Sequence, residues 1–310
     1  MFESQDQSIH PSSFPPTTML IDKTFHDVPT KNGGSVRIYV IAPVVPQYPH
    51  AKFPGVVVFS EIYQVTGPVE RFAGQIASQG FVVACPSVYH EFEGPDPIPY
   101  DTEGKDLKLI LSVEPRYMTI IVLGTDRGNK YKVEKELQAY DEDTTLAIDL
   151  LTSLKNCNGR IAATGMCLGG HLAFRAAFDP RVLSSVCFFA TDIHSASLGK
   201  GKNDDSLQKV KNGGLSGKGE LVMIFGKQDT HVPRQGRDLI RKTLEDANVP
   251  VSFLEVQAQH AFIRDEHSKG RWDAALTRSL FTFMMEVFER TVGRDLGPKL
   301  ALDAEPEHVC

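Results

Sequence analysis

The segment IAATGMCLGGHLAF, residues 161–174, decides the fold. It reads as a buried strand that ends at a glycine, followed by an isolated cysteine and by two glycines that open a helix. Gly165 and Gly169 stand two residues before and two residues after Cys167. A sharp strand-to-helix turn leaves no room for side chains at those two places, and it makes the central side chain project from the sheet. The pattern G-x-C-x-G therefore predicts a nucleophilic thiol, Cys167, at the end of a strand.

The other cysteines have a different setting. The chain has five cysteines without C-x-x-C pairing, which indicates neither a disulfide framework nor a zinc site. Cys85 in FVVACP and Cys187 in SSVCFFA lie in apolar runs, where a cysteine is a small buried hydrophobe. Cys167 instead precedes a helix, whose positive end favours the thiolate. Because G-x-C-x-G is short and also arises by chance in a glycine-containing turn, the prediction needs catalytic partners.

Strands and helices alternate along most of the chain. Apolar, β-branched runs predict strands at 18–25, 35–43, 54–60, 81–86, 160–165, 181–190, 220–226 and 251–256. Helical spacing predicts helices at 68–80, 135–156, 168–178, 234–248 and 271–292. This alternation predicts an α/β fold in which a mostly parallel central sheet carries helices on both faces.

One domain accounts for this pattern. We expect it to span residues 19–292, after a flexible, proline-rich lead-in at residues 1–18 and before a frayed, charged tail at residues 293–310. Residues 91–133 interrupt the alternation and are interpreted as an excursion over the surface, and residues 191–218 as a polar loop.

Composition excludes several function classes. The formal net charge is −6 and no dense Lys/Arg tract is present, so nucleic acid is not an expected partner. No apolar run reaches the roughly 20 residues that a membrane helix needs, and the start of the chain does not resemble a signal peptide. The sequence therefore predicts a cytoplasmic protein without a membrane partner.

Partners for Cys167 follow two later strands. Asp229 comes directly after the predicted strand 220–226, and His260 follows the strand 251–256. The order nucleophile, acid, histidine suits a triad that converges at the carboxyl ends of parallel strands. Taken singly, Asp229 also suits a turn former and His260 a core histidine. His231 is the substitute if His260 is misassigned, and the absence of spacings such as H-E-x-x-H predicts no metal site.

The sequence resembles the dienelactone hydrolases (carboxymethylenebutenolidases), which have the α/β-hydrolase fold. The motifs that carry the resemblance are PGVVVFSEIYQV, ACPSVY, GMCLGGHLAF, FGKQDTHVP and HAFIR, between about residues 34 and 290. The resemblance implies a triad of Cys167, Asp229 and His260.

The resemblance also implies roles for residues around the triad. Glu61 would partner the thiol in the resting site and influence its ionisation. The backbone N–H groups of Ile62 and Leu168 would form the oxyanion hole, which agrees with the general placement of such donors. A solvated carboxylate at the end of a strand is the other interpretation of Glu61.

The chain departs from the family at the site that binds a substrate carboxylate. Two arginines are expected there, and Arg264 in HAFIR matches one of them. In the Y-x-R segment that would hold the second, this chain has Tyr89, His90 and Glu91. We therefore expect Tyr89 and Glu91 near the substrate and weaker binding of an acidic lactone. Pairing with Glu61 is an equal alternative for Arg264.

Together these patterns predict a cysteine-dependent hydrolase of small esters or lactones that forms a thioester and needs no cofactor. A monomer or a homodimer is expected. A thioester, a sugar ester or a bulkier lactone are alternative substrates. The alternative from another class is a non-catalytic ligand-binding or redox-sensing protein on the same fold.

Overall fold

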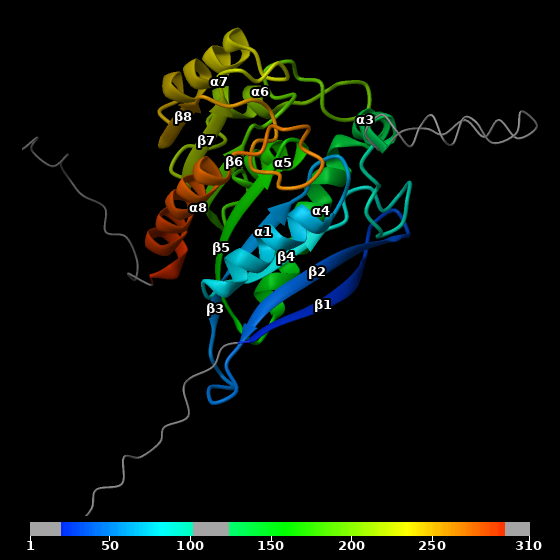
Figure 1. The fold of residues 1–310 in the computed structure, drawn as a ribbon, viewed down its shortest axis with the longest axis vertical. Coiled ribbons are helices and arrows are strands. Elements are labelled where there is room, and N and C mark those ends of the chain that lie inside the picture. Colours follow the sequence, from blue (N-terminus) through cyan, green and yellow to red (C-terminus); the bar gives the residue numbers. More distant parts are fainter. Residues whose placement is uncertain (1–19, 102–123, 295–310) are drawn as a thin grey trace, which may run out of the picture.

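The computed structural model of the protein describes residues 20–101 and 124–294. Within these residues, eight strands form one sheet in the order β1-β2-β4-β3-β5-β6-β7-β8 (Figure 1). The strands are β1 (Leu20–Pro29), β2 (Ser35–Val44), β3 (Phe53–Phe59), β4 (Val82–Pro86), β5 (Cys157–Met166), β6 (Val182–Phe188), β7 (Glu220–Gly226) and β8 (Val251–Val256). Strand β2 pairs antiparallel with β1 and β4, and all other pairs are parallel, so the predicted, mostly parallel sheet is confirmed.

Helices cover both faces of this sheet. They are α1 (Gly67–Ser78), α3 (Gly124–Glu134), α4 (Leu137–Ser153), α5 (Leu168–Ala176), α6 (Ser206–Lys211), α7 (Arg234–Asp246) and α8 (Ala274–Phe288), the last continued by a π-helical turn, η1 (Glu289–Gly293). Buried side chains of α4, α5 and α7 belong to one hydrophobic cluster, and those of α1 and α8 to a second. The sheet thus carries one layer of helices on each face, which is the arrangement of the α/β-hydrolase fold.

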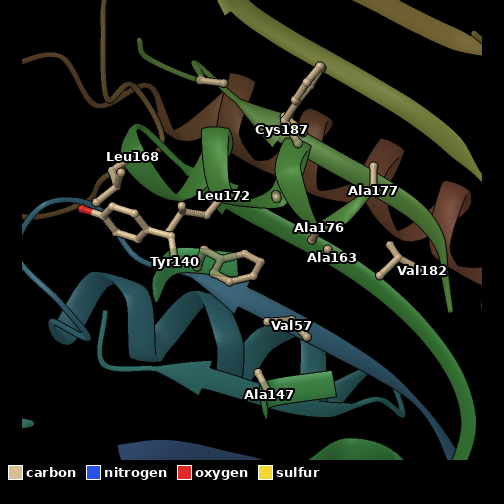
Figure 2. Packing of buried hydrophobic residues seen from close by; sticks show 14 of the residues in the cluster. Val57, Tyr140, Ala147, Ala163, Leu168, Leu172, Ala176, Ala177, Val182 and Cys187 are labelled. Carbon is tan, nitrogen blue, oxygen red and sulfur yellow. The ribbon is translucent and has the colours of Figure 1, made fainter. Parts of the chain in front are cut away.

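The central strands supply side chains to both clusters in alternation. Val57 of β3 belongs to the cluster under α4 and α5, whereas its neighbours Val56 and Val58 face α1 and α8. Figure 2 shows Ala147 of α4 and Leu172 of α5 in the first cluster with Val57. A continuous apolar run such as VVVF is stable here because water reaches neither face of the strand.

Two helices were missed by the sequence analysis. Residues 91–133, expected to be an irregular excursion, contain most of α3, and the expected loop 191–218 contains α6. The sequence of α3, GTDRGNKYKVE, has few apolar residues and two glycines, so it lacks the apolar stripe that predicts a helix. Residues 1–19, 102–123 and 295–310, which include the expected lead-in and most of the expected tail, lie outside the described residues.

Within residues 20–101 and 124–294, no helix is both long and apolar enough to span a membrane.

Candidate active site

The turn between β5 and α5 has the geometry that the glycines predict. Cys167 has φ 60° and ψ −117°, a strained conformation for a residue with a side chain. A Cβ atom on Gly165 would collide with the carbonyl oxygen of Gly169, and one on Gly169 would collide with that of Phe59. Because backbone atoms cannot give way as a flexible side chain can, both positions require glycine. The turn therefore holds Cys167 at the carboxyl end of the central strand β5.

Cys167 differs from the other cysteines of the described residues. It is partly exposed, whereas Cys85, Cys157 and Cys187 are buried. Burial raises the pKa of the Cys85 thiol to about 12 and raises the pKa values of the Cys157 and Cys187 thiols as well. Those three thiols are therefore protonated and shielded at neutral pH, as the sequence predicts for Cys85 and Cys187.

Asp229 and His260 meet at the ends of β7 and β8. The Nδ1 atom of His260 lies 2.7 Å from Oδ2 of Asp229, and both residues are buried. Burial alone would lower the pKa of His260. A hydrogen bond and charge interaction with Cys167, together with those from Asp229, outweigh burial and raise this pKa to about 10. The structure thus brings the three predicted triad residues into one interacting group.

His231, the substitute histidine, lies beside this group. Its ring centroid is 4.3 Å from that of His260, and its backbone N–H donates to Oδ1 of Asp229. The carboxylate of Asp229 therefore binds the ring of His260 with one oxygen and the backbone of His231 with the other. Burial and the charge of His260 lower the pKa of His231, which favours its neutral form.

Glu61 and Arg264 form a buried ion pair. Nη1 of Arg264 donates to Oε2 of Glu61 at 3.1 Å. The side chain of Arg264 is 6% exposed and that of Glu61 is 2% exposed. The Tyr100 hydroxyl also donates to Oε2, at 3.4 Å, while Nη2 of Arg264 donates to the carbonyl of His267 at 2.8 Å. Within the described residues, the Glu61 carboxylate thus accepts hydrogen bonds from Arg264 and Tyr100, and its partnership with the thiol stays a prediction. The alternative role for Arg264, pairing with Glu61, is what the structure shows.

The two predicted oxyanion donors occupy suitable elements. Leu168 is the first residue of α5, where a backbone N–H has no acceptor within the helix. Ile62 follows β3, the neighbour of β5, and lines the same cavity as Cys167. The amides of these residues stay candidates for stabilising a negative oxygen next to Cys167.

A cavity of about 250 Å³ opens at the triad. Thr125, Asn129 and Lys132 line it from α3, at the spacing of one helical face. Lys132 donates to Asp192 at 3.0 Å. Burial opposes ionisation of Asp192, but Lys132 and nearby hydroxyl groups lower its pKa to about 2. These residues were not predicted, because residues 91–133 were expected to be an excursion over the surface; the helical spacing of the three polar residues was the available signal.

Tyr89 and Glu91 do not lie where the sequence analysis expected them. Neither lines the cavity. Tyr89 is fully buried, and its hydroxyl donates to the carbonyl of Gly128 at 3.0 Å. Glu91 accepts from Lys135 at 2.7 Å, and Lys135 also binds the buried Asp143 at 2.7 Å. Glu91 therefore compensates a buried lysine within the fold.

Known proteins that are similar to this chain point to one family. The sequence model of the dienelactone hydrolase family matches residues 38–292. The "Putative carboxymethylenebutenolidase" of Saccharomyces cerevisiae is 53% identical over 94% of this chain and 100% of its own length. A "Carboxymethylenebutenolidase" from a Pseudomonas species is 24% identical over 85% of this chain and 93% of its own. The crystal structure of a "Putative Dienelactone Hydrolase" from Klebsiella pneumoniae superposes with a TM-score of 0.65 at 17% identity, covering 87% of this chain and 99% of the other, which supports the fold alone.

Proposed function

Because the chain belongs to the dienelactone hydrolase family, and is a hydrolase of ester or lactone substrates, we propose that Cys167 is its nucleophile and that Asp229 and His260 complete the triad. The observation that carries this proposal is the arrangement of these three residues beside the cavity. Asp229 holds Nδ1 of His260 at 2.7 Å, and the same imidazole interacts with the partly exposed sulfur of Cys167. This arrangement supports Cys167 as the nucleophile and His260 as the group that exchanges protons with the substrate and water.

The proposed reaction has two stages. The Cys167 thiolate attacks the carbonyl carbon, and the negative oxygen that develops accepts hydrogen bonds from the amides of Ile62 and Leu168. The bond to the leaving oxygen then breaks, that oxygen takes a proton from His260, and a thioester remains on Cys167. His260, now neutral, removes a proton from water, the hydroxide cleaves the thioester, and the carboxylic acid leaves. The steps draw only on protein groups, substrate and water.

Glu61 has a supporting role in this proposal. Its carboxylate pairs with Arg264 at the wall of the cavity. We infer that it positions the segment from Glu61 to Ile62, and with it one of the two oxyanion amides. Arg264, whose Nη1 and Nη2 atoms are both engaged within the protein, acts on Glu61 in this scheme.

The proposal is tested by trapping the thioester. A panel of p-nitrophenyl esters and lactones is mixed with the enzyme, quenched in acid and examined by intact mass and peptide mapping. We expect an acyl group on the Cys167 peptide and at least a thousandfold loss of turnover in Cys167→Ala. The measurements are repeated in a Cys310→Ser background, so that acylation of Cys310 is not mistaken for acylation of Cys167. Equal turnover by the wild type and Cys167→Ala would remove the proposed nucleophile.

The same assay distinguishes the proposed enzyme from the alternative, a non-catalytic protein on the same fold. A ligand-binding or redox-sensing protein would be stabilised by esters or alkylated at Cys167 without forming product. Cys85, Cys157 and Cys187 are buried, so iodoacetamide should label Cys167 ahead of them. Labelling that abolishes hydrolysis in proportion to its extent supports the enzyme, whereas labelling of a protein that turns over none of the panel supports the binder.

A further inference from the structure

A second cavity, distinct from the one at the triad, lies at the edge of the sheet that β8 forms. Its volume is about 340 Å³, and α7, β8 and the residue after β7 line it. Figure 1 shows α7 beside β8 at this end of the sheet. The lining residues are all charged, namely Lys227, Arg234, Arg237, Asp238, Arg241 and Glu255. None of them lines the cavity at Cys167.

Four cations and two carboxylates share this cavity, which leaves an excess of two positive charges. Glu255 serves two arginines, because its oxygens lie 3.3 Å from Nε of Arg237 and 2.5 Å from Nη2 of Arg241. Asp238 lies 3.6 Å from Arg234 and 3.9 Å from Arg241, and both distances exceed a hydrogen bond. The acids of the cavity therefore do not neutralise its cations.

Other acids near the cavity do not correct this excess. Asp229, the acid nearest to Lys227 in sequence, belongs to the triad. Glu245 and Asp246 lie at the other end of α7 and do not line the cavity, and Asp246 binds Lys242 at 2.7 Å. Lys227 is exposed, and its side chain forms no ion pair with any residue that the structure describes.

Arg237 is buried in the wall of the cavity with donors to spare. It is 3% exposed, and its Nη1 atom donates to the carbonyl of Val232 at 2.8 Å. In the described part of the chain, its Nε atom has no hydrogen-bond acceptor, because Glu255 approaches it without forming a hydrogen bond. A buried polar group without a partner is destabilising, and a bound ion or ligand is one of the few reasons for a protein to keep it.

The start of α7 adds an independent preference for an anion. Arg234 and Arg237 both lie in the first turn of this 13-residue helix, and that turn contains no acidic residue. Cations are unfavourable at the positive end of a helix, whereas an anion there is stabilised by the helix dipole and by backbone N–H groups without acceptors. The sequence thus breaks a local rule of stability at this cavity, which is typical of a functional site.

We propose that the cavity beside α7 is a binding site for a phosphoryl group, either inorganic phosphate or the phosphate of a small molecule. A phosphate monoester carries about −1.5 to −2 charges at neutral pH, which matches the excess of two cations, and its oxygens suit the forked donors of arginine. The site uses none of the three triad residues. The inference therefore goes beyond the proposed function and does not depend on it.

The test is calorimetric titration of the full-length protein with inorganic phosphate, glucose 6-phosphate and glucose, in chloride buffer at constant ionic strength. We expect both phosphates to bind and glucose not to bind. Lys227→Gln and Arg241→Gln should each raise Kd about tenfold, because each removes a charge-assisted contact. Arg237 is buried and its replacement can unfold the protein, so the exposed Lys227 and the half-buried Arg241 are the residues to change.

Two matched variants locate the site. Lys242→Gln removes an exposed cation of α7 that does not line this cavity, and Arg271→Gln removes a cation of the catalytic cavity. Both should keep Kd within about twofold of the wild type. Tighter binding of glucose 6-phosphate than of inorganic phosphate would identify an organic phosphate as the ligand, and the reverse would identify phosphate itself.

Three results would overturn the inference. They are no binding of either phosphate below about 10 mM, a wild-type Kd in Lys227→Gln or Arg241→Gln, and loss of binding in Arg271→Gln. The same titration of Cys167→Ala should give the wild-type Kd. A failure of this inference is therefore distinguishable from a failure of the proposed hydrolase function.

Discussion

Nδ1 of His260 and Oδ2 of Asp229 lie 2.7 Å apart, although 31 residues separate them in the chain. The contact exists because β7 and β8 are parallel neighbours, so that the residues after each strand emerge at the same edge of the sheet. In the proposed mechanism, the carboxylate orients the imidazole so that its other nitrogen serves Cys167. Together, Cys167 and Asp229 overcome the effect of burial and raise the pKa of His260 to about 10.

This pKa predicts an alkaline limit for acylation. The folded value, about 10, lies above the unfolded value of 6.5, so the charge interactions of His260 stabilise the fold fully below pH 6.5. That stabilisation is lost as the pH rises through about 10. Single-turnover acylation should fall over the same range, because the imidazolium that protonates the leaving group disappears. In Asp229→Asn the limit should move to lower pH; identical profiles for the two proteins would contradict the pairing.

The Glu61 and Arg264 pair predicts strong coupling in unfolding. Removing one partner leaves a buried charge uncompensated, and we expect Glu61→Gln and Arg264→Gln each to lower the free energy of unfolding by about 3–5 kcal/mol. The double variant should lose clearly less than the sum of the two. Urea unfolding measures all three, and Lys242→Gln, which breaks the exposed pair with Asp246, serves as the control with an effect below about 1 kcal/mol. Additive effects at Glu61 and Arg264 would argue against the pair.

Alanine substitutions at two glycines should have opposite effects on stability, because only one of the two lies in the tight turn at Cys167. Gly169→Ala forces a Cβ atom against the Phe59 and Ser60 carbonyls, so we expect a loss of about 2 kcal/mol together with lower activity. Gly74→Ala, in α1, meets no atom within 4 Å and should stabilise the protein by up to about 1 kcal/mol. Thermal unfolding and esterase assays distinguish the two. A neutral Gly169→Ala would mean that the turn can relax.

The cluster around Lys135 predicts an effect on stability and not on substrate binding. Lys135 is 1% exposed and binds both Asp143 and Glu91, so Lys135→Met should cost about 3–5 kcal/mol. Glu91→Gln should cost about 1 kcal/mol because Glu91 is 33% exposed. Neither residue lines the cavity, and KM for p-nitrophenyl esters should stay within about twofold in Glu91→Gln. A larger change in KM would return Glu91 to the substrate site.

The sequence by itself determined the strands of the sheet, most of its helices and the turn at Cys167. Apolar runs such as VVVF and the flanking glycines of Cys167 act through local sterics and water exclusion, which depend on neighbours a few residues away. For this reason the mostly parallel sheet and the strained Cys167 could be predicted. The α3 helix could not, because its polar sequence gains stability from the elements around it and not from its own periodicity.

Only the tertiary structure decided which charges meet. Glu91 binds Lys135, Arg264 binds Glu61, and Arg237 shares Glu255 with Arg241. Each of these outcomes depends on where distant segments approach one another. Ion pairing acts over a few ångströms in space and is indifferent to distance along the chain, so the sequence supplied the charges while the packing of the sheet and helices chose their partners.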